Sequence, residues 1–350
     1  MTIVKASWGN IDGRDVSLYT LTNAKGMVMK VTDYGGIITE LHVPDKAGKQ
    51  ADIVLGFDDL AGYVKSSPYF GAIIGRVANR IKDARFELEG KTYELAANNG
   101  KHTLHGGKKA WDKVVWDAET TDTPDGPSIR LTYVSKDGEE GYPGTVHATN
   151  VYTWTNDNEL RIDMRATTDK TTIVNMAHHT YWNLGGHDSG LIVDHQVKIN
   201  ADTFTPGDAN DLIVGGAIES VKGSPWDFTT AKPVGKDLQA AGGNPVGFDA
   251  NWIVNGDPHQ MRENVRVKDP KSGRVMVVQG DQPGVQFYSG NFLDGSIRGK
   301  GGAKYEQYGA ICVETQRFPN SINVPAWRSE VILKPGETYQ SAMIHRFTAE

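Results

Sequence analysis

Apolar and polar side chains alternate with a period of two along most of this sequence, and this pattern constrains the fold more than any other feature. Every second residue is apolar in the segments 129–133 and 160–166. Successive side chains of a β-strand point to opposite faces of its sheet, so this period is typical of strands with one buried face. The sequence therefore predicts a protein built mainly from β-strands.

Turn-forming residues separate the apolar segments at short intervals. Asn, Lys and Gly occur within residues 23–26, and Glu, Gly and Lys make up residues 89–91, each time between two apolar segments. Both segments predict hairpins between antiparallel strands. Helical patterning is confined to residues 58–64, which leaves too few helices to connect parallel strands. We therefore expect an antiparallel sandwich or barrel.

No repeat, low-complexity tract or linker divides the chain. Short apolar runs at 275–278 and 310–313 suit buried strands. Gly, Pro and Asp are frequent between residues 207 and 247, which predicts a long loop region on a domain and not a domain boundary. A length of 350 residues would allow two domains, but single all-β domains can be this long. We expect residues 1–350 to form one domain.

The charge balance and the single cysteine exclude several classes of protein. The 37 Lys and Arg against 43 Asp and Glu give a net charge of −6 without a basic cluster, which disfavours nucleic-acid binding. One cysteine cannot form an intrachain disulfide or a cysteine-based zinc site, which fits a reducing compartment. No segment of about 18 apolar residues could cross a membrane, and residues 1–10 lack a signal-peptide pattern. We expect a cytoplasmic protein, with an exported form left open.

Two short motifs in the first third of the chain combine polar side chains with glycine. Residues 75–80 include Arg76, Asn79 and Arg80, whose N–H donors suit recognition of hydroxyl or carboxylate groups. The alternative is a strand end held by salt bridges. His105 is followed by two glycines, which would let a ligand approach the imidazole closely. The alternative is a turn in which the histidine is a bystander.

A third motif, residues 175–184, contains two adjacent histidines followed by aromatic and amide side chains. In an extended segment His178 and His179 point to opposite faces, so they cannot both serve one site, and one is expected to be structural. The indole of Trp182 offers a flat apolar face of the kind that covers the C–H face of a sugar ring. The alternative is a polar strand end with a buried histidine.

Two further segments place polar side chains beside aromatic ones. Asp249 lies between Phe248 and Trp252, where its carboxylate could accept two hydroxyl hydrogen bonds, unless it only closes a turn. Gln286 and Tyr288 share one face of a predicted strand and could line a polar groove, although an ordinary strand explains this pattern equally well.

A carboxylate follows the apolar run that ends at residue 313. Cys312, Glu314 and Gln316 share one strand face. Partial burial would tune the pKa of Glu314 for work as a general base, whereas the thiol has no basic neighbour in the sequence and is expected to be inert. The sequence lacks the motifs of nucleotide-binding folds, zinc proteases and serine hydrolases. The residues alone predict a β protein that binds a polar ligand.

Taken in order, these motifs resemble those of the aldose 1-epimerases, the galactose mutarotase family. The resemblance runs from Tyr34-Gly35-Gly36 near the start of the chain to residues 333–339 near its end. It implies an all-β fold, a large antiparallel β-sandwich with few short helices. It also implies a mutarotase, an isomerase that interconverts the α and β anomers of free aldoses such as glucose or galactose by acid and base catalysis, with neither cofactor nor metal.

The same resemblance implies roles for individual residues. Glu314 corresponds to the general base of the family, His179 to the general acid and His105 to a second active-site histidine. The residues implied in sugar binding are Asn79, Arg80, Asp249 and Gln286. The family usually has Asn at the position of His178, but the Thr-Tyr-Trp-Asn-Leu that follows favours His179 as the acid.

Three alternatives stay open from the sequence. A hexose-6-phosphate 1-epimerase would need a basic cluster for its phosphate. A glycosidase would use Asp249 and Glu314 as paired carboxyl groups on either side of the bond to be cut. A non-catalytic sugar-binding domain would need no paired His and Glu. For the epimerase, the expected partner is a monosaccharide, with neither nucleic acid nor membrane, and the protein is expected to be a monomer or a homodimer.

Overall fold

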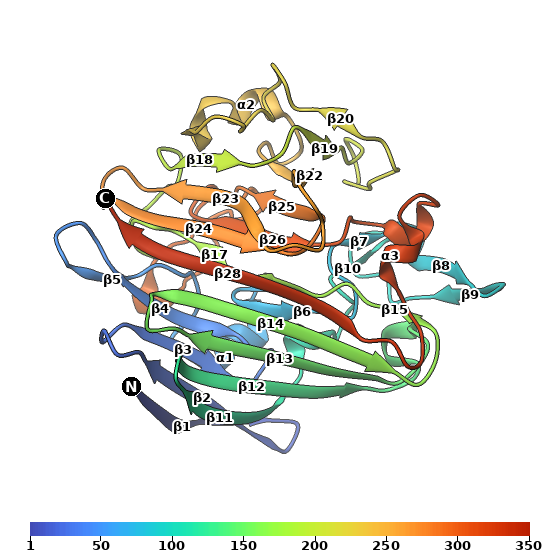
Figure 1. The fold of residues 1–350 in the computed structure, drawn as a ribbon, viewed down its shortest axis with the longest axis horizontal. Coiled ribbons are helices and arrows are strands. Elements are labelled where there is room, and N and C mark those ends of the chain that lie inside the picture. The colour runs from blue at the N-terminus through green and yellow to red at the C-terminus, as the bar shows by residue number, and fades with distance from the viewer.

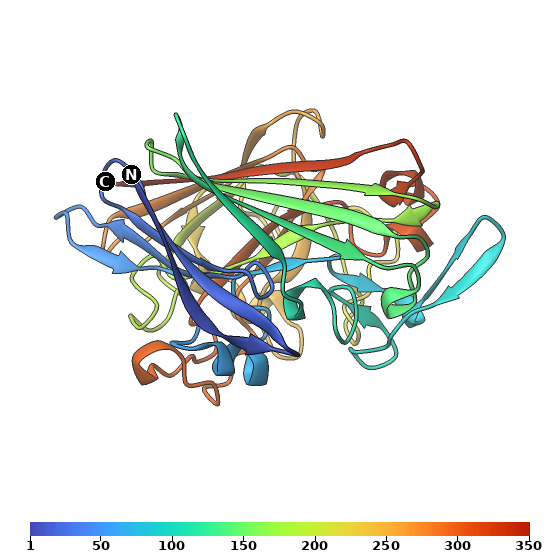
Figure 2. The same cartoon turned by 90° about the horizontal axis from the view of Figure 1, so that it is seen from below.

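The alternating segments form the strands of antiparallel sheets in the computed structural model, which describes residues 1–350 apart from the side chain of Ser66. The three large sheets have nine, six and five strands, and four pairs of short strands accompany them. The nine-stranded sheet forms one layer, and the other sheets lie on one side of it (Figure 1, Figure 2). The prediction of an all-β antiparallel fold is confirmed.

The nine-stranded sheet has the order β11-β12-β13-β14-β28-β24-β23-β18-β21. Its strands are β11 (Asp117–Thr123), β12 (Gly126–Ser135), β13 (Val146–Trp154), β14 (Glu159–Thr168), β28 (Tyr339–Ala349), β24 (Arg274–Gly280), β23 (Arg262–Lys268), β18 (Gln196–Ile199) and β21 (Lys232–Pro233). The last strand of the chain, β28, pairs with β14 on one side and β24 on the other, so it runs through the middle of the sheet (Figure 1). Along β14 buried positions alternate with more exposed ones, as the period of two predicted.

The six-stranded sheet has the order β17-β26-β25-β22-β19-β20. Its strands are β17 (Tyr181–Trp182), β26 (Ile311–Gln316), β25 (Gly284–Tyr288), β22 (Asp249–Ile253), β19 (Thr203–Thr205) and β20 (Glu219–Ser220). Val285 and Phe287 of β25 belong to the same buried cluster as Val278 of β24 and Met343 of β28. The main core therefore lies between the two largest sheets, and the alternate side chains of β25 face away from it.

The five-stranded sheet is built from the start of the chain, in the order β1-β2-β3-β4-β5. Its strands are β1 (Thr2–Ile11), β2 (Arg14–Thr22), β3 (Val28–Thr32), β4 (Ile38–Pro44) and β5 (Gln50–Asp52). The hairpin of β2 and β3 turns at the residues predicted for it. Leu21 and Met29 extend the main core, whereas the edge strand β1 is mostly exposed.

Four pairs of short strands complete the fold. They are β6 (Ala72–Ile74) with β16 (Ala177–His179), β7 (Arg80–Ile81) with β10 (Thr103–Leu104), β8 (Arg85–Leu88) with β9 (Lys91–Glu94), and β15 (Thr172–Ile173) with β27 (Ile332–Leu333). The hairpin predicted at residues 89–91 joins β8 to β9. The first two pairs matter most for function, since they carry polar side chains toward one end of the six-stranded sheet.

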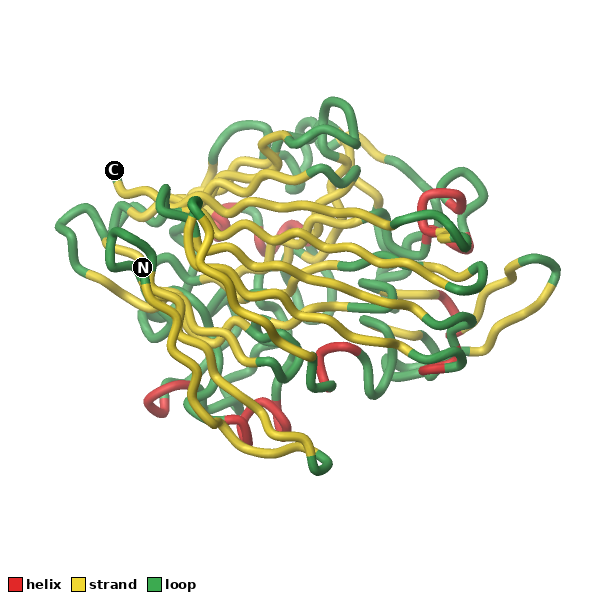
Figure 3. Tube along the Cα trace, turned by 60° about the horizontal axis from the view of Figure 1, so that its bottom comes forward, coloured by secondary structure: helices red, strands yellow, loops and turns green.

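Helices are short and few (Figure 3). The α-helices are α1 (Leu60–Ser66), α2 (Leu238–Ala241) and α3 (Arg328–Val331). The 3-10 helices are η1 (Lys82–Ala84), η2 (Trp111–Lys113), η3 (Glu139–Gly141), η4 (Val234–Lys236), η5 (Lys300–Gly302) and η6 (Ser321–Asn323). The helix predicted at 58–64 is α1, and its N-cap Asp59 accepts a hydrogen bond from the Gly62 N–H at 2.9 Å. Within the described part of the chain, no helix is long and apolar enough to cross a membrane.

Candidate active site

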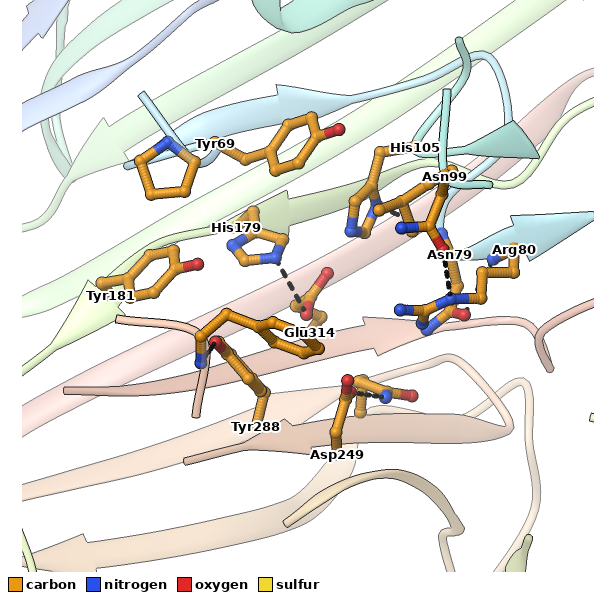
Figure 4. A pocket seen from close by; sticks show the side chains of 14 residues that line it. Tyr69, Asn79, Arg80, Asn99, His105, His179, Tyr181, Asp249, Tyr288 and Glu314 are labelled. Atoms are coloured by element: carbon orange, nitrogen blue, oxygen red, sulfur yellow. Dashed lines mark hydrogen bonds and ion pairs between the residues drawn. The ribbon is translucent and has the colours of Figure 1, made fainter. Parts of the chain in front are cut away.

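A pocket of about 160 Å³ opens at the end of the six-stranded sheet, where the pairs β6/β16 and β7/β10 meet it (Figure 4). The structure brings all seven predicted site residues to its wall: Asn79, Arg80, His105, His179, Asp249, Gln286 and Glu314. They come from six separate stretches of sequence. Only the tertiary fold brings them together.

Strand register explains why three of these side chains share one wall. Gln286 of β25 pairs with Glu314 of β26, and Tyr288 of β25 pairs with Asp249 of β22. Paired residues of neighbouring antiparallel strands point to the same face. The Gln286 amide donates to Asp249 Oδ1 at 2.6 Å and accepts from the Gln316 amide at 3.3 Å, which fixes its orientation.

His179 and Glu314 form the most enclosed contact of the pocket. Nε2 of His179 lies 3.6 Å from Oε1 of Glu314, and both side chains are buried. The second oxygen of Glu314 and Nδ1 of His179 are buried without a hydrogen-bond partner among the described residues. Both atoms are therefore free of other side chains and can take part in hydrogen bonds with a ligand in the pocket.

Burial shifts the pKa values of this pair in opposite directions. Loss of solvation, helped by the nearby charge of Asp249 and opposed by Arg80, raises the pKa of Glu314 well above its usual range. Loss of solvation lowers the pKa of His179 to about 4. When the pair holds a single proton, that proton is therefore favoured on the carboxyl group, which leaves both side chains neutral.

His105 supplies a neutral N–H donor. Its backbone has a φ of +50°, and its Nδ1 accepts the backbone N–H of Asn79 at 3.2 Å. Burial and the neighbouring His179 keep the pKa of His105 well below its usual value. With Nδ1 used as an acceptor, the proton of the neutral imidazole lies on Nε2. The His105 and His179 rings meet edge to face, 5.0 Å apart.

The same three side chains lie close enough to hold a metal ion. Ligand atoms of His105, His179 and Glu314 all lie within 4.8 Å of one another. A metal on Nε2 of His105 would require the ring proton on Nδ1, directed at the Asn79 N–H, so two donors would face each other. This donor set suits proton transfer better than metal binding.

A second cluster of Glu40, His42 and Asp52 lies outside the pocket. Cationic side chains already occupy its carboxylates: Lys30 Nζ lies 2.8 Å from Glu40, and the buried Lys300 is bonded to Asp52. The pair of Lys300 and Asp52 joins η5 to the five-stranded sheet, and the pair of Lys30 and Glu40 links β3 to β4. They give the cluster a structural role.

The two arginines of the motif at residues 75–80 separate. The Arg80 Nε donates to Asn99 Oδ1 at 3.1 Å, which holds the guanidinium at the pocket wall (Figure 4). Arg76 is buried elsewhere and donates to the Pro143 carbonyl at 2.8 Å and to the Ser135 hydroxyl at 2.7 Å. The pocket position of Arg80 is compatible with ligand recognition, which stays a prediction, whereas Arg76 is held by hydrogen bonds to neutral oxygens and not by the salt bridges of the alternative.

Sequence comparison with known proteins relates this chain to enzymes that act on sugars. The sequence model of the family described as aldose 1-epimerase matches residues 17–346. The chain belongs to the aldose 1-epimerase family. It is 45% identical over 318 residues to the galactose mutarotase of Bos taurus, covering 91% of this chain and 90% of that protein. It is 33% identical over 344 residues to the aldose 1-epimerase of Escherichia coli K12, covering 97% of each.

Solved structures show the same architecture. A galactose 1-epimerase from Lactobacillus acidophilus superposes with a TM-score of 0.86 at 25% identity, covering 99% of each chain. An aldose epimerase homologue from C. elegans gives the same TM-score at 28% identity, covering 94% of this chain and 98% of the other. The galactose mutarotase-like sandwich implied by the sequence motifs is therefore confirmed.

Trp182, whose indole was expected to cover a sugar ring, lies elsewhere. It is fully buried in the main core and does not line the pocket, and the same holds for Trp252 near Asp249. Trp182 packs on His345 and Phe347, with ring centroids 5.2 and 5.7 Å apart. Its indole lies on the core side of its strand, so the expectation for Trp182 was wrong.

The two glycines after His105 serve backbone packing instead of ligand approach. A Cβ on Gly106 would lie 2.0 Å from the carbonyl oxygen of Gly75, and one on Gly107 would collide with the side chain of Glu140. Both glycines have positive φ. They let the loop bend tightly and so position His105.

His178 is the structural histidine of its pair. It is buried on the side away from the pocket, where its Nδ1 lies 3.0 Å from the Thr180 hydroxyl and its ring meets Tyr152 edge to face. The prediction of opposite faces is confirmed. The same period of two could also have indicated Tyr181, which lines the pocket beside His179.

Several pocket residues gave no usable sequence signal. Tyr69 packs edge to face on His105 with ring centroids 4.7 Å apart, Asn99 holds Arg80, and Phe292 lies on the rim. These residues lie in loops, where no periodicity specifies direction.

Proposed function

We propose that this protein interconverts the α and β anomers of free aldoses by acid- and base-catalysed opening and reclosure of the ring. The observation that carries the proposal is the buried contact of 3.6 Å between His179 and Glu314 in a pocket whose other polar side chains include Asn79, Arg80, Asp249 and Gln286. The galactose mutarotases and aldose 1-epimerases named above support it, since the chain is similar to them over most of its length.

Ring opening moves two protons. The Glu314 carboxylate takes the proton of the C1 hydroxyl, a C1=O double bond forms, and the C1–O5 bond breaks. The electron pair of that bond stays on O5, which takes a proton from the His179 imidazolium. Rotation about C1–C2 exposes the other face of the aldehyde, and closure returns both protons by the reverse route. The atoms balance without transfer of electrons to another molecule.

The pKa shifts of the pair favour the two proton transfers. After ring opening, Glu314 is a carboxylic acid and His179 a neutral imidazole, which is the protonation state that burial favours. The reaction starts from the less favoured charged pair, which makes Glu314 a stronger base and His179 a stronger acid than in water.

The remaining side chains bind the sugar and stabilise charge on its oxygens. His105, through its Nε2–H, and Arg80 donate to the oxygen that becomes negative as bonds rearrange. Asn79, Asp249 and Gln286 bind hydroxyl groups.

The charge of the pocket favours a neutral sugar. Of its described lining side chains, Arg80 is the single full cation, and it faces the carboxyl groups of Asp249 and Glu314. A phosphorylated hexose would bring two further negative charges into this surrounding. We therefore prefer free aldoses to hexose phosphates as substrates.

Further features of the protein belong to the same proposal. The main core joins side chains from Tyr19 to Phe347, which supports one domain over residues 1–350. The cytoplasm as location, and a monomer or homodimer as the assembly, stay predictions of the sequence.

Replacement of Glu314 by Gln tests the proposal. Polarimetry of freshly dissolved α-D-glucose and α-D-galactose should show wild-type acceleration and a loss of about 10²–10⁴-fold in Glu314→Gln, the range for a general acid or base. Glu119→Gln is the matched control, because that side chain is 77% exposed and lies outside the pocket. A folded Glu314→Gln protein with full activity would refute the assignment.

A further inference from the structure

Tyr69 contacts both histidines of the pocket, although the mechanism above gives it no role. Its ring lies edge to face on His105 with centroids 4.7 Å apart, and at a tilt beside His179 with centroids 5.7 Å apart. Figure 4 shows the Tyr69 ring next to both imidazoles. Since the two imidazoles also meet each other at 5.0 Å, the three rings form one cluster. A displaced Tyr69 ring would therefore change the position of both imidazoles.

The backbone of Tyr69 adopts a conformation that other parts of the chain must hold in place. Its φ is +70°, in the left-handed region that a bulky side chain rarely occupies. The Tyr69 carbonyl accepts the Ala72 N–H at 3.2 Å, and the Gly71 N–H donates to the His179 carbonyl at 3.0 Å. Such conformations persist only where surrounding contacts impose them, and they cluster at functional sites. Tertiary contacts therefore set the direction of the Tyr69 ring.

One of these contacts is a cation over the face of the ring. Lys113 Nζ lies 5.2 Å from the Tyr69 centroid, within the reach of about 6 Å over which an aromatic ring attracts an ammonium group. Lys113 is not among the described residues that line the pocket. It belongs to η2, the first helix after the loop that carries His105. Lys113 thus acts on the pocket from outside it.

Asp112 holds the ammonium group of Lys113 in place. Lys113 Nζ lies 2.8 Å from Asp112 Oδ2, and the Asp112 side chain is only 5% exposed. Loss of solvation raises the pKa of Asp112, and the charge of Lys113 opposes this shift. The other carboxylate oxygen, Oδ1, is buried without a hydrogen-bond partner among the described residues. A buried carboxylate that depends on this cation restricts where the cation can lie.

The reaction needs both imidazoles in fixed positions. Each must reach an oxygen atom of the same sugar, and a misplacement of about 1 Å can lower a rate about 100-fold. The charge of Lys113 also reaches His105. Loss of solvation and His179 lower the pKa of His105 most, and the charges of Arg80 and Lys113 act in the same direction. Both effects of Lys113 support His105 as a neutral, oriented donor.

We propose that Lys113 is a positioning residue, whose ammonium group, held by Asp112, fixes the Tyr69 ring and through it the imidazoles of His105 and His179. The inference rests on the proposed function and adds a residue outside the pocket to its machinery. A purely structural ion pair between Lys113 and Asp112 would stabilise the loop after His105 without any effect on catalysis.

A double-mutant cycle tests whether Lys113 acts through Tyr69. Anomer exchange of glucose is followed by NMR on the wild type, Lys113→Met, Tyr69→Leu and the double variant. Lys113→Arg keeps the cation, and Tyr69→Phe keeps the ring. Lys109→Met is the matched control, because Lys109 lies in the loop before η2, is 64% exposed and pairs with Asp12 at 2.8 Å.

We expect Tyr69→Leu to lower kcat about tenfold to 100-fold and Lys113→Met to lower it about threefold to tenfold, with smaller changes in KM. The double variant should lose no more than Tyr69→Leu alone, since the two residues act in one chain of contacts. Lys113→Arg and Tyr69→Phe should keep most of the activity, and Lys109→Met all of it. The ring-proton NMR shifts of His105 and His179 should move in Lys113→Met and stay unchanged in Lys109→Met.

Removal of Lys113 alone leaves the buried Asp112 carboxylate without its cation. Where Lys113→Met does not fold, the combination of Lys113→Met with Asp112→Asn takes its place in the cycle, because it removes both charges together. The same loss of kcat is expected from this combination.

Three results would overturn the positioning role while leaving the proposed function intact. The first is a Lys113→Met protein with wild-type kcat, even if its unfolding temperature is lower. The second is an unchanged kcat in Tyr69→Leu. The third is a double variant whose loss of kcat is the product of the two single losses. A wild type that accelerates exchange of no monosaccharide would instead refute the proposed function itself.

Discussion

Glu314 and His179 differ from ordinary surface side chains mainly in their lack of water. Loss of solvation raises the pKa of Glu314 and lowers that of His179. A general base must accept a proton and a general acid must give one, so the pair works only while it holds one proton. The two pKa values therefore bound the active pH range. The general acid His179 has the lower pKa and the general base Glu314 the higher one, the reverse of the usual order.

The pH dependence of kcat/KM should show which residue limits activity on each side of the optimum. Below about pH 4 His179 also becomes protonated, the pair holds two protons, and Glu314 can accept none. Above the raised pKa of Glu314 the pair holds no proton, and His179 has none to give. We expect a bell-shaped pH profile. Its acid limb should have a midpoint near pH 4, and its alkaline limb a midpoint well above the usual pKa of a carboxyl group. Buffer-catalysed exchange is subtracted with enzyme-free controls.

Spectroscopy assigns the two limbs to residues. Infrared difference spectra of the protein without sugar, recorded at a pH between the two limbs of the profile, should contain a carbonyl band of a protonated carboxyl group that Glu314→Gln removes. ¹⁵N NMR should show His179 neutral under the same conditions. An ionised Glu314 beside a protonated His179 in the empty enzyme would contradict the prediction.

For single residues, the sequence indicated Glu314 and His179 as candidates for the acid and the base, but it did not indicate their protonation states. The period of two separates His179 from His178, and the apolar run before Glu314 indicates a strand that delivers it to a site. The direction of each pKa shift depends on how completely other segments bury the pair, and periodicity within one strand carries no such information. Asn99, a loop residue that accepts a hydrogen bond from Arg80, was not predicted for the same reason.

At the scale of elements, the segment 75–81 shows how one short motif serves two parts of the molecule. Arg76 joins this segment to the end of β12 and to Pro143 and Thr172 by hydrogen bonds. Arg80, four residues later, lies at the pocket wall. The sequence could not separate these roles, because both arginines are donors of the same kind and the direction of each depends on long-range packing.

Matched substitutions of the two arginines should separate stability from binding. Arg76→Met leaves buried carbonyl groups without donors, so we expect a loss of about 3 kcal/mol in stability and a lower unfolding temperature. KM should change little in the surviving folded protein. Arg80→Met should raise KM for glucose about tenfold, the effect of losing a charge-assisted hydrogen bond, and should shift the unfolding temperature much less. Calorimetry and polarimetry measure the two effects, and equal effects of both variants on KM would contradict the division.

Local sequence signals predicted turns and a helix correctly, but they did not predict which face of a strand meets the core. The hairpins at residues 23–26 and 89–91 and the helix α1 form where local turn and capping signals predicted them. Trp182 was misplaced because an alternating pattern says that two side chains differ in face, not which face meets the core. The pair Gly106-Gly107 was misread because a glycine needed for close backbone packing looks the same in sequence as one that makes room for a ligand.

At the scale of the whole molecule, strand order and chain order differ. The last strand, β28, lies in the middle of the nine-stranded sheet between β14 and β24, and its side chains Tyr339, Met343 and Phe347 are buried in the main core. The first strand, β1, is an edge strand that pairs with β2 alone and is mostly exposed. The two ends of the chain therefore contribute very unequally to stability.

Deletion of either terminal strand should reveal this difference. Ending the chain after Glu337 removes β28, which exposes two strand edges and the core beneath them, and removes the Tyr339 hydroxyl that accepts the Met176 N–H at 3.0 Å near the site. We expect this chain to lose its near-ultraviolet circular dichroism and all mutarotase activity. A chain that starts at Asp12 loses the edge pairing of β1, the contacts of Trp8 with Tyr63 and of Lys5 with Tyr19, and the packing of partly buried side chains at the rim of the clusters. It should keep its fold and activity with a lower unfolding temperature, because the pocket and both largest sheets stay complete. A folded, active chain without β28, or an unfolded one without β1, would show that sheet position does not determine the contribution of these strands.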